Sequence, residues 1–137
     1  RTLDVGLPNQ LDEPERHLFF RCRSLSTEWG EQEHESVGLD LWYHATHALC
    51  DVLRQHPEWI QGFRVVELGC GCGVAGIFCA MLGAAHVLFT DRDTHALEVC
   101  SENVFLNRTD TTLSMVEINT GQLFWGSSGV SDSSPAD

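Results

Sequence analysis

The most constraining feature of the chain is a glycine-rich segment that directly follows a β-branched pair. Residues 65–76 read Val-Val-Glu-Leu-Gly-Cys-Gly-Cys-Gly-Val-Ala-Gly. Gly69, Gly71 and Gly73 have no side chains, so backbone N–H groups and the start of a following helix can approach a ligand closely. Apolar residues continue at helical spacing over 74–82, and Gly83 is typical of a helix end. The segment therefore predicts a strand, a ligand-binding loop and a helix in succession.

A second strand is predicted over 86–90, and Asp91 follows it. A carboxylate at the carboxyl end of that strand can accept hydrogen bonds from both hydroxyls of a ribose. Each such charge-assisted bond is worth roughly 1.5–3 kcal/mol. The glycine loop and Asp91 together predict a nucleoside site.

Two nucleosides fit this pattern. Gly71-x-Gly73-x-x-Gly76 satisfies the dinucleotide fingerprint, and Asp91 lies 20 residues beyond Gly71. Glu67, however, would repel a pyrophosphate, whereas it can face the ammonium or sulfonium group of S-adenosylmethionine. More than 60 residues also precede this strand, although a dinucleotide fold usually begins with it. The sequence therefore favours S-adenosylmethionine and leaves a dinucleotide such as NAD as the alternative.

The N-terminal part, residues 1–41, differs in pattern from the rest. Residues 1–16 are polar and contain Pro8 and Pro14, which predicts an extended or frayed arm. Apolar and polar residues alternate in places over 17–41, with Leu18 and Phe20 on one side. This alternation predicts a β-hairpin packed beside the main sheet.

Residues 42–126 are expected to form the cofactor-binding half of a domain. A helix predicted over 42–56 carries one apolar stripe that should cover the sheet, namely Ala45, Ala48, Leu49 and Val52. A second helix over 93–107 begins at Asp93 or Thr94 and should bury Ala96, Leu97, Cys100, Val104 and Phe105. A third strand is predicted over 113–118. The serine-rich residues 127–137 are expected to be a disordered tail or the start of an insertion.

The composition limits the partners. The net charge is -12, from 20 acidic and 8 basic residues, which argues against a nucleic-acid partner and fits a basic protein better. No apolar run approaches the length of a membrane span, and no signal-peptide pattern opens the chain, so no membrane partner is expected. The six cysteines are expected to be reduced and mostly buried, which indicates a cytoplasmic or nuclear setting.

Two pairs of potential metal ligands are present. Cys70 and Cys72 flank one glycine, so their thiols should point to different sides, and no second cysteine pair follows. His44 and His47 lie one helical turn apart, without an evident third ligand. We therefore predict no metal site.

Five landmarks along the chain resemble a known family. They are Gly-Leu-Asp-Leu-Trp42, the glycine segment itself, Phe-Thr-Asp91, Asn103 with Asn107, and Leu-Phe-Trp-Gly126. In this order they look like the landmarks of the small seven-strand protein methyltransferases, the lysine methyltransferase-like enzymes of methyltransferase family 16. The resemblance implies a Rossmann-like class I methyltransferase fold, with a doubly wound and mostly parallel α/β sheet. It also implies S-adenosylmethionine-dependent methylation of a protein side chain, most often lysine.

The chemistry of the donor and this resemblance together assign residues to the cofactor. The glycine loop would run alongside the methionine part of S-adenosylmethionine, Glu67 would orient that part, and Asp91 would hold the ribose. By resemblance, Trp42 lies near the methionine end and Trp125 against the adenine, although Phe124 departs from the polar residue that the family often has there. The expected cofactor-binding residues are Trp42, Glu67, Gly69, Gly71, Gly73, Asp91 and Trp125.

The acceptor side of such an enzyme is missing from the pattern. Only three of about seven expected strands are found, and nothing corresponds to the acid and tyrosine that line the acceptor channel in the family. We therefore expect an N-terminal portion that is inactive alone, and we assign no catalytic residue. A non-catalytic, methyltransferase-like interaction protein stays open as a further alternative.

Overall fold

A parallel three-stranded sheet forms the centre of the fold. The computed structural model describes residues 2–3, 18–20, 24–26 and 40–126, with only the backbone described for 2–3, 24–26 and 40–43. The strands are β5 (Arg64–Leu68), β6 (His86–Asp91) and β7 (Glu117–Gln122), in the order β5-β6-β7. All three are parallel, so their carboxyl ends meet at one edge of the sheet.

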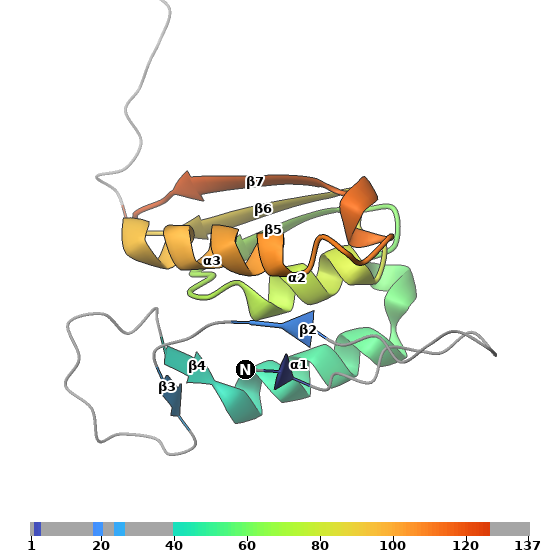
Figure 1. The fold of residues 1–137 in the computed structure, drawn as a ribbon, viewed down its shortest axis with the longest axis horizontal. Coiled ribbons are helices and arrows are strands. Elements are labelled where there is room, and N and C mark those ends of the chain that lie inside the picture. The colour runs from blue at the N-terminus through green and yellow to red at the C-terminus, as the bar shows by residue number, and fades with distance from the viewer. Residues whose placement is uncertain (1, 4–17, 21–23, 27–39, 127–137) are drawn as a thin grey trace, which may run out of the picture.

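Two helices cover one face of this sheet. Helices α2 (Val74–Met81) and α3 (Thr94–Leu106) lie side by side against it (Figure 1). Val87 and Phe89 point to these helices and are fully buried, as the period of two along a strand requires. On the opposite face Val66 and Leu68 are 55% and 59% exposed, and none of the described helices covers them.

Helix α2 lies in a middle layer. Its other side contacts α1 (Tyr43–Gln55) and the short strand β2 (Leu18–Phe19), so that the sheet, α2 and α1 follow one another in Figure 1. All residues of α2 except Ala75 are buried, which is the composition expected of a helix covered on all sides. The parallel sheet and its crossover helices confirm the predicted first half of a doubly wound α/β fold.

The prediction for α1 was wrong in one respect. The helix exists within the predicted limits, but it packs on α2 through Cys50 and Leu53 and does not cover the sheet. The predicted apolar stripe is exposed instead, at Ala45, Ala48, Leu49 and Val52. Cys50 and Leu53 give the helix a second apolar side, so the sequence alone did not specify which side meets the core.

The N-terminal strands also differ from the prediction. Strand β1 (Thr2–Leu3) pairs with β2 antiparallel, whereas β3 (Ser24–Ser26) pairs with β4 (Asp40–Trp42) in parallel. Two parallel strands cannot form a hairpin, because they need a crossover connection. The alternation of apolar and polar residues predicts a strand but does not specify its partner. Leu18 and Phe20 are buried, as the alternation predicted, but β2 lies against α2 instead of the sheet. The remainder of the predicted arm, hairpin and tail lies outside the described residues.

The segment before β7 corrects the third predicted strand. A single 3-10 turn, η3 (Leu113–Met115), stands where the strand was expected, and β7 begins only at Glu117. The Asp110 carboxylate accepts a hydrogen bond from the Leu113 N–H at 3.0 Å, and such local side-chain bonds favour turns over strands. Helix α3 begins as predicted, with Asp93 as its N-cap, but Phe105 is 74% exposed and does not face the core.

Helix α2 packs tightly against the sheet at Gly76. A Cβ atom at this position would overlap the Phe89 ring and lie 2.6 Å from Glu67 Oε2. We expect Gly76→Ala to lower the free energy of unfolding by about 1–3 kcal/mol, because the helix must move off the sheet. Gly121→Ala is the matched control, since its Cβ would meet only Leu88 Cδ1, at 3.9 Å. Urea unfolding of both variants measures the difference, and equal stabilities would contradict the close packing at Gly76.

Candidate cofactor site

The glycine loop lies at the carboxyl end of β5, between that strand and α2. Gly69, Gly71 and Gly73 have φ angles of 70°, 52° and 80°. Gly73 is the N-cap of α2, and a Cβ there would overlap the Cys100 Sγ of α3. The loop can therefore pass this close to α3 only with glycine at position 73.

Two acidic side chains accept hydrogen bonds from the loop and from α2. The Gly71 N–H donates to Asp91 Oδ2 at 2.9 Å, and the Gly76 N–H donates to Glu67 Oε2 at 2.9 Å. Asp91 Oδ1 accepts a further bond from the Asp93 N–H at 3.0 Å. The two acids predicted to bind cofactor thus also hold the loop against the ends of β5 and β6.

The charge of Glu67 is poorly solvated. Burial raises the pKa of Glu67 from 4.5 to about 7; the Gly76 hydrogen bond lowers it, and the neighbouring Asp91 raises it further. Burial likewise raises the pKa of the nearby Cys50 and Cys79 thiols to about 12, so both are uncharged near neutral pH. A cation placed beside Glu67 would favour its ionised form.

The two tryptophans are described to different extents. Trp125 follows β7 and is 74% exposed, and a Cβ built on Gly69 would lie 3.3 Å from its Cζ2, so the ring stands over the start of the loop. Trp42 is described only by its backbone, as the last residue of β4. The structure therefore brings Trp125 together with the loop, while the predicted role of Trp42 stays a prediction.

The site fits S-adenosylmethionine chemically. An ionised carboxylate can accept about four hydrogen bonds. Asp91 accepts two, from the Gly71 and Asp93 N–H groups, so its oxygens can still accept bonds from ribose hydroxyls. Glu67 supplies a carboxylate whose low solvation favours a cationic neighbour. Trp125 offers an exposed aromatic face for a base.

The described part of the chain holds cysteines only as free thiols. Five cysteines are free and buried there, whereas Cys22 lies outside it. Within the same residues, no three side chains from His, Cys, Asp and Glu gather in a way that could hold a metal ion. Nor is any described helix both long and apolar enough to span a membrane.

Sequence reasoning missed part of what positions the site. The Thr90 hydroxyl donates to the Glu67 carbonyl at 2.8 Å, and the Cys70 N–H donates to the Thr90 carbonyl at 2.9 Å. The Asn103 side chain donates to the Cys72 carbonyl in the loop at 2.8 Å. Thr90 directly precedes Asp91 at the end of β6, and this position was the sequence signal available for its bond to Glu67. No local sequence signal indicated that Asn103 bonds Cys72.

Comparison with known proteins identifies the family. A sequence model of the lysine methyltransferase family matches residues 24–137, which is most of the chain. The chain therefore belongs to this family. Membership confirms the family predicted from the motifs, the Rossmann-like methyltransferase fold and S-adenosylmethionine as the cofactor, and it decides against the dinucleotide alternative.

Individual relatives share shorter segments. The chain is 47% identical over 53 residues to a ribosomal protein L11 methyltransferase from Thermotoga neapolitana, covering 39% of this chain and 20% of that protein. It is 40% identical over 67 residues to the electron transfer flavoprotein beta subunit lysine methyltransferase of Xenopus laevis, covering 49% and 27%. The matches thus span less than a third of these curated relatives.

Solved structures also resemble part of the chain, among them one bound to S-adenosyl-L-homocysteine. It is the Pyrococcus abyssi tRNA (uracil-54, C5)-methyltransferase in complex with S-adenosyl-L-homocysteine. The TM-score is 0.43 at 22% identity, over 57% of this chain and 18% of that one.

The raised pKa of Glu67 predicts a pH dependence of stability. Between pH 4.5 and about 7 the folded protein binds more protons at this site than the unfolded chain, so the stability contributed by Glu67 falls as pH rises through this window. Glu67→Gln keeps an acceptor for the Gly76 N–H but removes the charge. Relative to this variant, the free energy of unfolding of the wild type should fall by about 2 kcal/mol between pH 5 and pH 8.

Urea unfolding at both pH values measures this difference. The exposed Glu117 of β7, whose carboxylate accepts a bond from Asn119, supplies the control, because Glu117→Gln should leave the pH dependence unchanged. A wild type and Glu67→Gln variant with parallel pH profiles would show that Glu67 is already ionised at pH 5.

Proposed function

We propose that the protein is an S-adenosylmethionine-dependent methyltransferase that methylates a protein side chain, with lysine as the acceptor. The observation that carries the proposal is the glycine loop at the strand ends, fixed by Asp91 and Glu67, in a chain of the lysine methyltransferase family. The geometry supports a nucleoside with a cationic part, and the family supports the acceptor.

Positioning is the main contribution expected of these residues. S-adenosylmethionine supplies the methyl group on a sulfonium sulfur when it is bound. The loop exposes backbone to the methionine part, Glu67 places negative charge beside it, and Asp91 offers oxygens to the ribose. Trp125 covers the loop from the side of β7 and is placed to stack on a base. We assign no catalytic residue within the described part of the chain.

The charge of the chain supports a basic protein as the methylation substrate. With a net charge of -12, the protein would attract a basic partner and repel a phosphate backbone. Relatives are named for protein substrates, ribosomal protein L11 and the electron transfer flavoprotein beta subunit. We further propose a cytoplasmic or nuclear location, which the free, buried thiols support.

Calorimetric titration of the full-length protein tests the cofactor. We expect binding of S-adenosylmethionine and S-adenosylhomocysteine and no binding of NAD, because the Glu67 carboxylate beside the glycine loop would repel a pyrophosphate. Comparable or tighter binding of NAD would overturn the assignment. Cofactor binding without methyl transfer to any protein in a radiolabelled assay would instead favour a non-catalytic interaction protein.

Asp91 can be tested separately as the ribose ligand. We expect Asp91→Ala to weaken S-adenosylhomocysteine binding by about one to two orders of magnitude, since bonds of roughly 1.5–3 kcal/mol are lost. Asp93→Ala is the matched control, because it removes the N-cap bond to the His95 N–H, 2.9 Å long, and leaves Asp91 in place. The control should lose about 1 kcal/mol of stability and keep its affinity. Lower stability with unchanged affinity in Asp91→Ala would show that Asp91 only supports the loop.

A further inference from the structure

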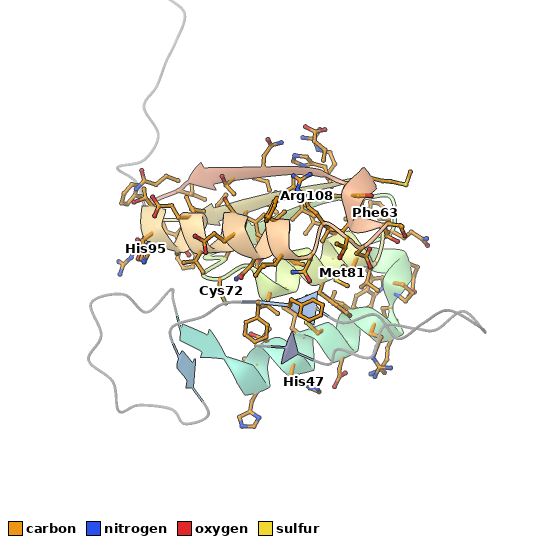
Figure 2. The ribbon with its side chains drawn as sticks, viewed as in Figure 1. His47, Phe63, Cys72, Met81, His95 and Arg108 are labelled. Carbon is orange, nitrogen blue, oxygen red and sulfur yellow. The ribbon has the colours of Figure 1, made fainter. Side chains whose placement is uncertain are left out.

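A buried asparagine of α3 is hydrogen-bonded to the glycine loop. The Asn103 side chain has no exposed surface, and its Nδ2 donates to the Cys72 carbonyl at 2.8 Å, 31 residues away in sequence. Figure 2 shows Cys72 beside α3, at the entry to α2. A buried amide is costly unless it is hydrogen-bonded, and the bond to the Cys72 carbonyl satisfies a donor of the Asn103 amide while it ties the loop to α3.

The loop is held at successive residues by different elements. The Cys70 N–H donates to the Thr90 carbonyl of β6, and the Gly71 N–H donates to Asp91. Asn103 then fixes the peptide that follows, just before Gly73 begins α2. Without Asn103, the end of the loop nearest the helix would lose its bond to α3, while the end nearest the strands would keep its bonds to β6.

The same hydrogen-bond chain continues to the N-terminal strand. Asn107 Nδ2 donates to the Asn103 carbonyl at 2.7 Å and to the Phe19 carbonyl at 2.6 Å. Asn107 Oδ1 accepts from the Phe19 N–H at 2.8 Å, so this side chain pairs with the backbone of β2 as a neighbouring strand would. Leu18 and Phe20, on either side, are buried in the core. The position of β2 is therefore linked to the loop through two side chains.

We propose that Asn103 is a positioning residue for the cofactor loop and that Asn107 joins the N-terminal strand β2 to it, so that β2 contributes to cofactor affinity from outside the site. The inference rests on the proposed function. Asn103 acts through the Cys72 peptide and does not contact the cofactor, because its side chain is wholly enclosed.

Two isosteric variants of the full-length protein test the proposal. Asn103→Asp replaces the amide donor with an acceptor that faces the Cys72 carbonyl, and Asn103→Leu removes the polar group at similar volume. We expect each to raise the Kd for S-adenosylhomocysteine at least about tenfold, measured by calorimetry on folded protein. Asn107→Leu should raise it by a smaller factor, since it acts one step further from the loop.

A stability-matched control separates positioning from general stability. Val104→Ala truncates the neighbouring core residue of α3 and should lower the melting temperature while leaving the Kd unchanged. The exposed Asn119 of β7 supplies a second control, Asn119→Leu, with no link to the loop. Wild-type affinity in folded Asn103→Leu, or an equal loss in Val104→Ala, would overturn the proposal.

Amide exchange gives a readout that does not depend on the cofactor. In Asn103→Leu, amides over 69–74 should exchange faster than in Val104→Ala, with the rest of the sheet equally protected. If the wild type binds no S-adenosylhomocysteine, the proposed function fails while this exchange test still decides the role of Asn103. If Asn103 variants do not fold, the same comparison is made with Asn107→Leu, and unchanged loop exchange would refute the link to β2.

Discussion

The described structure depends on hydrogen bonds that two largely buried carboxylates accept from glycine N–H groups. Asp91 joins Gly71 to the end of β6, and Glu67 joins Gly76 to the end of β5. Bonds to an ionised acceptor are stronger than neutral ones, and the helix dipole favours a carboxylate near a helix start, but at Glu67 these effects offset only part of the cost of burying the charge. The loop is thus fixed relative to two strands and one helix by the side chains that also define its chemistry.

This arrangement leaves a charge that the described residues compensate only in part. Glu67 is desolvated, and one hydrogen bond from Gly76 does not restore its ordinary pKa, while Asp91 adds a second acidic group nearby. A site of this kind favours a cationic ligand over a phosphate. The electrostatics and the family membership of the chain therefore support S-adenosylmethionine independently of each other.

The layered packing explains how distant segments meet at the loop. Helix α2 has neighbours on both sides, so glycine at position 76 and a nearly all-apolar sequence are required. Helix α3 contacts the sheet and also reaches β2 through Asn107. Asn103, which lies 31 positions beyond Cys72, therefore bonds the loop directly. Phe19, which lies some 50 positions before the loop, is linked to it through Asn107.

The sequence by itself determined the strand, loop, helix, strand and acid of residues 65–91, because glycine positions and hydrophobic periodicity are local signals. It also located α3 and its N-cap. Tertiary structure alone decided that α1 meets the core through Cys50, that Phe105 is exposed, and that Asn103 bonds the loop. Periodicity shows that a helix has an apolar face but not what covers it, and a hydrogen bond across 31 residues leaves no local pattern. Those features follow from how the layers pack, which no short segment encodes.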